Sequence, residues 1–267
     1  MGCAIVLNMK TSVTAELCKI ARKRLLQMHY ESGVGHIGGN LSALDALLII
    51  VHEYLDSADR FILSKGHAAG ALYTALWSKG LLLDEDLKTF HHDGTKLPGH
   101  PPSIGTAEIP FATGSLGHGL GLAAGMALAN KIKGSKDQIF CILSDGECQE
   151  GSTWEALLFT AHHQLKNLTI LVDHNHLQGF GATQDISSLE PLAQKLGVLS
   201  FDFHQVSGHD LTALRAALNT PASQPKMIVM ETVKGKGISF MENKMEWHYL
   251  PLNDSQYTQA IQEIDRR

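Results

Sequence analysis

Two short apolar runs in the sequence lead into side chains that carry oxygen atoms. The run at 139–143 is followed by Asp145, and the run at 168–172 is followed by Asn175. Each run is rich in β-branched residues and is typical of a buried strand. Because ligands of open α/β sheets bind at the carboxyl ends of the strands, we expect Asp145 and Asn175 to lie side by side. A carboxylate and an amide oxygen are hard donors, suited to Mg²⁺ or Ca²⁺ shared with a phosphate.

The same residues also have a simpler interpretation. Asp-Gly after a strand is a common turn, and Asp-His-Asn is an ordinary loop composition. Taken alone, the two motifs leave a metal site and a plain turn equally open. The pair Glu150-Gly151 at the start of the next helix and the spacing to Asn175 favour the metal site.

Histidine is unusually frequent, with 15 residues in the chain. Several of them lie beside glycine, as in Gly35-His36, Gly66-His67, Gly99-His100, Gly117-His118 and Gly208-His209. Glycine lets the backbone approach a ligand closely, and histidine supplies a donor or an acceptor near neutral pH. A single Gly-His pair means little, but its recurrence at the ends of successive elements favours function.

The apolar periodicity predicts the elements that position these residues. Helices are expected at 11–28, 41–55, 68–78, 85–89, from 113–119 to about 131, 153–165, about 189–196 and 211–218, and strands at 60–64, 139–143, 168–172, 198–206 and 227–232. A glycine-rich break is expected at 32–40, and an irregular tail from about 234, with a polar C-terminal helix. The alternation of strands and helices predicts a single α/β domain over 1–267, with a mostly parallel sheet flanked by helices on both faces.

Composition excludes several classes of protein. With 44% hydrophobic residues, 18% charged residues and a net charge of −5, the chain has the balance of an ordinary globular protein. No broad basic surface for nucleic acid is expected, and no run of ~18 apolar residues predicts a membrane span. The first ten residues do not resemble a secretory signal. The four cysteines show neither zinc spacing nor a disulfide framework, so we expect a cytoplasmic protein.

Beyond these general features, the chain resembles the diphosphate-binding half of the transketolases, which use thiamine diphosphate. The matching segments occur in the family's order and cover the chain from about Lys10 to Pro251. They are Ser64-Lys65-Gly66-His67, Gly99-His100-Pro101, Thr113-Gly114-Ser115-Leu116-Gly117, Ser144-Asp145-Gly146, Asp173-His174-Asn175, Lys234-Gly235-Lys236-Gly237 and Trp247-His248. The resemblance implies the diphosphate-binding type of the thiamine diphosphate fold.

The resemblance also implies a cofactor site. Asp145, Asn175 and the carbonyl of Leu177 would ligate Mg²⁺ or Ca²⁺. The amide of Gly146 would touch the diphosphate, and the adjoining Glu147 is assigned to the same site. The remaining implied cofactor contacts are Gly114, Ser115 and Leu116 along the two rings of the cofactor, and His67 and Lys234 on its phosphate side.

The implied reaction moves a two-carbon ketol unit from a ketose (phosphate) to an aldose (phosphate), with the cofactor as the electron sink. Alkoxides form and collapse in such a reaction, so imidazoles are suitable acid–base groups. The implied catalytic histidines are His36, His67, His100 and His248, of which His248 also contacts the cofactor. Glu150 matches a family carboxylate at the subunit interface that relays charge between two active sites.

Three departures from the family pattern stand out. Ser144 occupies the position of the first glycine of the metal motif, and would be strained if that position needs a positive φ. His118 stands where the family has glutamine. Residues 38–40 replace a proline-containing segment, which leaves the role of His36 open.

The family's second domain, which binds the aminopyrimidine and supplies a catalytic glutamate, does not fit after Arg267. We therefore expect half a site, completed by a separate C-terminal subunit, with two copies of each chain. One alternative is another thiamine diphosphate enzyme component, of the 2-oxo acid or deoxyxylulose type. The other is a non-catalytic relative that serves in binding or regulation.

Overall fold

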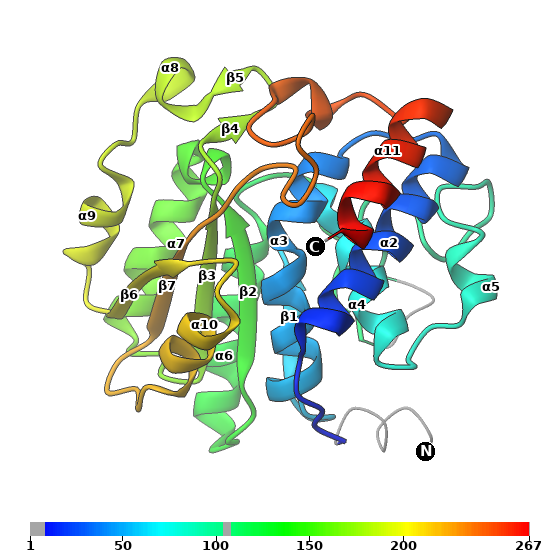
Figure 1. Ribbon diagram of the computed structural model, residues 1–267. Helices are drawn as coiled ribbons and strands as arrows, with labels where there is room; N and C mark the ends of the chain where they lie inside the picture. Colours follow the sequence, from blue (N-terminus) through cyan, green and yellow to red (C-terminus); the bar gives the residue numbers. More distant parts are fainter. Residues whose placement is uncertain (1–8, 104–107, 267) are drawn as a thin grey trace.

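A computed structural model describes residues 9–103 and 108–266 and is built around a five-stranded parallel sheet (Figure 1). The strand order is β1-β2-β3-β7-β6, and each neighbouring pair is parallel. The strands are β1 (Arg60–Leu63), β2 (Ile139–Ser144), β3 (Leu168–His174), β6 (Asp202–Ser207) and β7 (Lys226–Glu231). Two further strands, β4 (Leu177–Gln178) and β5 (Gly181–Ala182), form a separate antiparallel pair. The predicted parallel α/β sheet is confirmed.

Helices cover the sheet and connect its strands. They are α2 (Ala15–Ser32), α3 (Ile37–Ile49), α4 (Ala69–Ser78), α5 (Asp84–Leu87), α6 (Gly119–Lys133), α7 (Gly151–His162), α8 (Thr183–Ser187), α9 (Leu192–Gly197), α10 (Leu211–Asn219) and α11 (Asp254–Asp265). A π-helical turn, η1 (Ile50–Tyr54), extends α3, and the 3₁₀ turns are η2 (Gly66–Ala68), η3 (Gly146–Gln149) and η4 (Met245–His248).

Both faces of the sheet are buried, as predicted. Along β2, Phe140 and Ile142 point to one face and pack with α2, α3, α4, α10 and α11. Cys141 and Leu143 point to the other face and pack with α6, α7 and α9. This alternation follows from the period of two in a strand. A parallel sheet covered on both sides explains why its strands read as continuous apolar runs.

The helix boundaries differ from the sequence prediction near the amino end. The predicted break at 32–40 is wrong in its second part, because residues 37–40 form the first turn of α3. Only Gly33, with φ 63°, ends α2. Glycine at position 38 is explained by tertiary packing instead, because a Cβ there would lie 3.0 Å from Cγ of Lys234 and 3.1 Å from the carbonyl oxygen of Trp247.

Other elements also differ from the prediction. The helix expected to open at 113–119 begins at Gly119, so residues 113–118 form a loop over the end of β1. The β4–β5 pair and α8 lie in a stretch for which no element was predicted. The predicted irregular tail contains η4 before α11, and it lies beside β4 at the carboxyl edge of the sheet (Figure 1). The extent of the domain over 1–267 stays a prediction.

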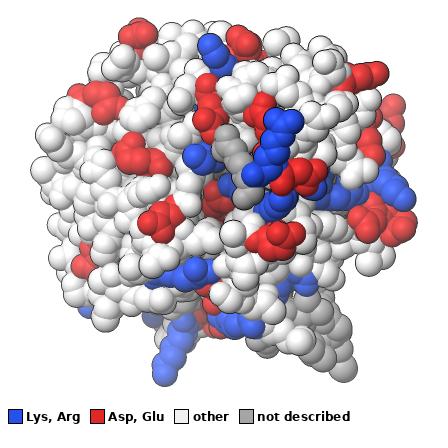
Figure 2. Space-filling view, viewed as in Figure 1, with Lys and Arg blue, Asp and Glu red and all other residues white. Residues whose placement is uncertain are grey.

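The charges on the face seen in Figure 2 are mixed, with Lys and Arg residues among Asp and Glu residues. No broad basic patch covers this face. Within residues 9–103 and 108–266, no helix is both long and apolar enough to cross a membrane.

Gly119 generates a test of the packing between α6 and β1. A Cβ at this position would lie 2.4 Å from Oγ and 2.7 Å from Cα of Ser64. We expect Gly119→Ala to lower the free energy of unfolding by about 1–3 kcal/mol, because the backbone of β1 must move. Urea unfolding measures the difference.

Gly121 provides the matched control on the same helix. It is exposed, and a Cβ there meets no atom within 4 Å. Gly121→Ala should be neutral or should stabilise the protein by about 0.4–1 kcal/mol, since alanine restricts the unfolded chain. Equal effects at the two positions would contradict close packing of α6 on β1.

Candidate functional site

The pairing of β2 with β3 brings the two predicted oxygen ligands to one edge of the sheet. Ser144 is in register with Asp173, and the amide of Asp145 donates to the carbonyl oxygen of Asp173 at 3.1 Å. Asp145 and Asn175 therefore follow neighbouring strands, as predicted. Both side chains are buried, with 1% and 4% of their surface exposed.

The carboxylate of Asp145 is held by backbone donors. One oxygen accepts from the amide of Gly146 at 2.7 Å, and the other accepts from the amide of His176 at 2.6 Å and the hydroxyl of Thr183 at 3.3 Å. Burial, together with the nearby charge of Asp173, raises the pKa of Asp145. A buried carboxylate with a raised pKa, bonded to no cationic side chain among the described residues, is suited to a metal cation.

Asn175 and Leu177 place two further oxygens beside this carboxylate. The amide oxygen of Asn175 accepts from the backbone amide of Leu177 at 3.2 Å, which orients the turn. The carbonyl oxygen of Leu177 already accepts from the ammonium of Lys234 at 3.3 Å, so this oxygen is in contact with a positive charge. Carboxylate, amide and carbonyl oxygens fit a hard divalent cation such as Mg²⁺ or Ca²⁺.

Lys234 supplies a buried positive charge next to these oxygens. Its side chain is 1% exposed, and its ammonium also contacts Nδ1 of His248 at 2.9 Å. Within the described residues it forms no ion pair. Burial, with the charge of Lys65 as a second cause, lowers the pKa of Lys234 to about 8. An ammonium with no carboxylate partner fits an anion such as a phosphate.

The four predicted catalytic histidines form one cluster. The ring centroid of His36 lies 5.7 Å from that of His67, 6.1 Å from that of His100 and 5.1 Å from that of His248. The rings of His67 and His248 are 5.3 Å apart. His36 holds its place through a left-handed backbone, with φ 65°, and an amide that donates to the carbonyl oxygen of His248 at 3.0 Å.

The histidines of this cluster are held neutral. Burial is the first cause in each case, and neighbouring histidine or lysine side chains add to it. The pKa falls to about 4 for His36 and to about 3 for His248, and it is also lowered for His67 and His100. Neutral imidazoles can accept a proton or donate a hydrogen bond at neutral pH.

A cleft of about 170 Å³ joins these groups. The predicted site residues that line it are His67, Leu116, Asp145, Gly146, Asn175, Leu177, Lys234 and His248. His36 and His100 line an adjoining cavity of about 60 Å³ that also includes His67. A larger cavity of about 350 Å³ between α2 and α10 contains none of the predicted residues.

The other predicted residues lie around the cleft rather than on its wall. Gly114, with φ 151°, packs against His100, since a Cβ there would lie 3.1 Å from the imidazole. Ser115 is exposed beside it. Glu150 is exposed at the start of α7, close to Gly117.

Glu147 is fully buried and its carboxylate is turned into the protein. It accepts from the hydroxyl of Ser64, from the amide of Gly117 at 2.9 Å and from the amide of Ser144 at 3.4 Å. These bonds tie the 113–118 loop to the ends of β1 and β2. The observed contacts of Glu147 therefore position the loop that carries Leu116.

Ser144 fits its position without backbone strain. It is the last residue of β2 and is absent from the residues with positive φ. Its hydroxyl accepts from the amide of Glu147 at 3.2 Å. Serine can replace the family's glycine here because the backbone at this position is extended.

A buried ion pair beneath the cleft was not predicted. Lys65 and Asp173 are both 0% exposed and form a salt bridge. The same carboxylate accepts from Ser42 at 2.6 Å and from Thr232, and the Lys65 ammonium donates to the carbonyl oxygen of Gly39 at 3.0 Å. Lys65 and Asp173 belong to separate motifs of the sequence, and nothing in their spacing indicates that they meet.

Further neighbours of the cleft were also missed. Gln178, Gly179, Phe180 and Tyr249 line it. A Cβ at Gly179 would lie 2.4 Å from the Tyr249 hydroxyl, so glycine is needed for this approach. The position of Tyr249 directly after His248 was the only indication in the sequence.

The chain matches known proteins over most of its length. Residues 31–264 match the family described as "Transketolase, thiamine diphosphate binding domain". One subunit of the apulose-4-phosphate transketolase of Actinobacillus succinogenes is 35% identical over 96% of this chain and 98% of its own length. The 6-deoxy-6-sulfo-D-fructose transketolase subunit SqwG of a Clostridium species is 36% identical over 92% of this chain and 94% of its own.

Solved structures of transketolases have the same fold as this chain. The crystal structure of transketolase from Campylobacter jejuni superposes with a TM-score of 0.84 at 27% identity, over 94% of this chain. The chain spans only 42% of the length of that structure. The chain therefore belongs to the transketolase family, in the part that forms the thiamine diphosphate binding domain.

Proposed function

We propose that this chain is the N-terminal subunit of a split transketolase that transfers a two-carbon ketol unit from a ketose to an aldose. One observation carries the proposal. A single cleft joins three oxygen-bearing groups, a buried lysine with no ion-pair partner among the described residues, and two neutral histidines, with two more histidines in the adjoining cavity. That combination suits a metal-bound diphosphate next to reacting hydroxyl groups.

In this proposal the chain holds the diphosphate end of thiamine diphosphate. Asp145, Asn175 and the carbonyl of Leu177 would ligate Mg²⁺ or Ca²⁺, and Lys234 would pair with a phosphate oxygen. The amide of Gly146 and the neighbouring Glu147 would lie on the same side. The two rings of the cofactor would lie along Gly114, Ser115 and Leu116. When bound, the cofactor supplies the electron sink for cleavage of a carbon–carbon bond.

The histidines would then handle protons on sugar oxygens. His67 and His248 line the cleft, where His248 contacts the lysine, and His36 and His100 line the adjoining cavity, with the ring of His36 within about 6 Å of the other three. Because their pKa values are lowered, these imidazoles can accept a hydroxyl proton at neutral pH and return it to an alkoxide.

A separate C-terminal subunit would complete the site. The relatives that this chain matches along nearly their whole length are named as subunits, whereas the single-chain transketolase is more than twice as long. Glu150 is exposed and available to contact a second copy. We propose an assembly of two copies of each chain, with Glu150 relaying charge between two sites.

The substrates are proposed to be sugars with an anionic end. One relative is named for a phosphorylated sugar and the other for a sulfonated one. Phosphorylated sugars are the first candidates, and sulfosugars are the second because of the Clostridium relative. A cytoplasmic location is also proposed, supported by the free thiols of Cys18, Cys141 and Cys148.

The proposal is tested by co-purifying the chain with the product of an adjacent reading frame that encodes a C-terminal transketolase subunit. Ketol transfer is then assayed with thiamine diphosphate and Mg²⁺. Activity should require both chains and the cofactor. A folded complex that turns over neither phosphorylated nor sulfonated ketoses would overturn the enzymatic proposal and favour a binding or regulatory protein.

Asp145→Asn tests the metal assignment. The substitution keeps the shape of the side chain but removes one negative charge from the proposed metal site. We expect the affinity for thiamine diphosphate in the presence of Mg²⁺ to fall at least about 100-fold, as for the loss of a charged metal ligand. Isothermal titration on the two-chain complex measures this affinity.

Asp185→Asn is the matched control, because Asp185 is exposed on α8. It should bind the cofactor as the unmodified protein does. The thermal midpoint of Asp145→Asn without cofactor should stay within a few degrees of normal, which separates lost binding from lost folding. Unchanged cofactor affinity in Asp145→Asn would refute the metal assignment.

Lys234→Met tests the phosphate contact. Methionine preserves much of the buried stem and removes the ammonium, so the apolar packing on Gly38 should survive. We expect cofactor affinity to fall about 10–100-fold, because the variant loses one or two charge-assisted hydrogen bonds. Lys236→Met, a half-exposed neighbour, should leave the affinity unchanged. An equal loss in both variants would argue against a specific phosphate contact.

The neutral state of His36 predicts a pH dependence of stability. Its pKa in the folded protein is about 4, below the ordinary value of 6.5. As the pH falls, His36 therefore takes up its proton at a higher pH in the unfolded chain than in the folded protein. The stabilisation is complete above pH 6.5 and is lost as the pH falls toward 4, by about 2 kcal/mol for this partly exposed group. The titratable side chains around His36 are His29, His67, His91, His100, His248, Lys234 and Tyr249.

His36→Asn removes this contribution, and asparagine tolerates the left-handed backbone. The free energy of unfolding, measured in urea between pH 7 and pH 4, should fall less steeply in the variant than in the unmodified protein. His92→Asn, an exposed histidine, is the control. Parallel curves for His36→Asn and the unmodified protein would contradict a buried neutral His36.

A further inference from the structure

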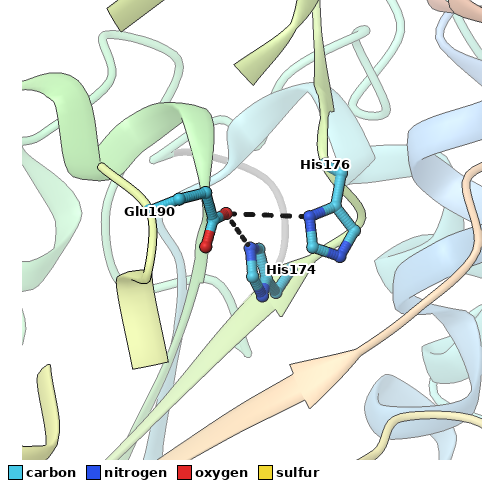
Figure 3. A group of neighbouring side chains, drawn as sticks. All are labelled: His174, His176 and Glu190. Atoms are coloured by element: carbon cyan, nitrogen blue, oxygen red, sulfur yellow. Dashed lines mark hydrogen bonds and ion pairs between the residues drawn. The ribbon is translucent and has the colours of Figure 1, made fainter. Parts of the chain in front are cut away.

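Three side chains beside the cleft form a group with metal-binding geometry. His174, His176 and Glu190 each offer one ligand atom, and these atoms lie within 4.8 Å of one another (Figure 3). Nε2 of His174 lies 2.9 Å from a carboxylate oxygen of Glu190, and Nδ1 of His176 lies 3.7 Å from the same oxygen. None of the three has a role in the proposed transfer reaction.

The spacing of these atoms suits a small transition-metal ion. In a tetrahedral site with bonds of about 2.0–2.1 Å, the ligand atoms are about 3.3–3.4 Å apart. The two distances of 2.9 and 3.7 Å lie on either side of that value. Shifts of a few tenths of an ångström in the ligand atoms would complete the site. The side chains of Glu190 and His176 are 36% and 55% exposed, so they have room to move by this amount.

A second carboxylate orients the buried histidine. His174 is 4% exposed, and its Nδ1 lies 3.0 Å from a carboxylate oxygen of Glu231. Glu231 is itself fixed by the amide of Gln205, which donates to it at 2.9 Å. Metal-bound histidines commonly donate their second ring nitrogen to a carboxylate in this manner, which leaves the first nitrogen free to bind the metal.

The group is distinct from the diphosphate site, although the two are adjacent. His174 precedes and His176 follows Asn175, but their rings lie together near Glu190, tilted by 48° with centroids 3.9 Å apart, outside the cleft lining. Two imidazoles and a carboxylate also differ chemically from the all-oxygen set of the cleft. Imidazole suits Zn²⁺ and its neighbours in the transition series, whereas Mg²⁺ prefers oxygen.

We propose that His174, His176 and Glu190 form a second metal site that takes Zn²⁺ or a similar divalent transition ion, with Glu231 as a positioning residue. Three protein ligands leave the fourth position to water. The ion would fasten the segment before α9, which carries Glu190, to the end of β3. The amide of His176 donates to Asp145 at 2.6 Å, so the same ion would also steady the turn next to the cofactor.

The rival interpretation is a metal-free network in which His174 carries a proton and donates to Glu190 and Glu231 from its two ring nitrogens. The contacts at 2.9 and 3.0 Å satisfy that network as well. The two interpretations differ in whether the group takes up an ion, which can be measured directly.

The test uses the full chain after removal of metals by a chelator, in buffer with excess Mg²⁺ to saturate the oxygen site. Zn²⁺ is titrated by calorimetry, and Co²⁺ is titrated by its visible absorption, which is intense in tetrahedral sites. We expect one equivalent of Zn²⁺ at sub-micromolar Kd and a tetrahedral Co²⁺ spectrum. Zn²⁺ should also raise the thermal midpoint, because the folded chain, with its ligands already assembled, binds the ion more tightly than the unfolded chain does.

Variants locate the ion. His176→Ala combined with Glu190→Gln should weaken Zn²⁺ binding at least about 100-fold, and Glu231→Gln should weaken it about 10–100-fold. His92→Ala, an exposed histidine elsewhere, should bind Zn²⁺ normally. The binding readout does not depend on transfer activity, so the proposal can fail while the enzymatic proposal stands.

Three results would overturn the proposal. The first is no uptake of Zn²⁺ tighter than about 10 μM by the unmodified chain, which would favour the protonated network. The second is normal Zn²⁺ binding by the double variant. The third is an equal loss of Zn²⁺ binding in His92→Ala, which would mean that the ion does not bind specifically at this group. The Co²⁺ spectrum of the unmodified chain needs no variant, so the test holds even if a substitution impairs folding.

Discussion

The structure depends on one buried ion pair, between Lys65 and Asp173, at the carboxyl edge of the sheet. Both side chains are fully buried, and burying two charges is costly unless their remaining donors and acceptors are also bonded. Here Ser42 and Thr232 donate to the carboxylate, and the lysine donates to the carbonyl oxygen of Gly39. Four separate stretches of the chain therefore meet at one point, and the loss of either charge would leave the other unpaired.

Each of these stretches continues within three residues to a residue that lines the cleft or the adjoining cavity. His67 follows the lysine of the pair, Asn175 follows the aspartate, Lys234 follows the threonine at the end of β7, and His36 lies just before the first turn of α3. The ion pair thus holds Asn175, Lys234 and two of the clustered histidines in a fixed relation. It also places a positive charge behind the histidines, which is one reason why they stay neutral. A rigid arrangement of this kind is what proton transfer at a bound substrate requires.

The parts of the fold that could be predicted are those governed by local pattern. The runs at 139–143 and 168–172 are β2 and β3 almost to the residue, because strands buried on both faces must be apolar throughout. The predicted boundaries of helices and strands were wrong where tertiary contacts determine where an element begins or ends. Glycines 38 and 39 predict a break in the helix, yet they lie inside α3, since the backbone there packs against neighbouring side chains. The β4–β5 pair was missed because two-residue strands carry no periodicity.

The sequence by itself determined which residue types are available and in what order. It placed oxygen-bearing side chains after successive strands, histidines beside glycines, and family motifs along almost the whole chain, and these were sufficient for the fold class and the family. Only the tertiary structure decided which of these residues meet. Three features depend on contacts between distant segments. They are the inward orientation of the Glu147 carboxylate, the ion pair of Lys65 with Asp173, and the contact of His174 with Glu190. Such contacts are set by strand order, register and packing, and these leave no spacing rule in the sequence.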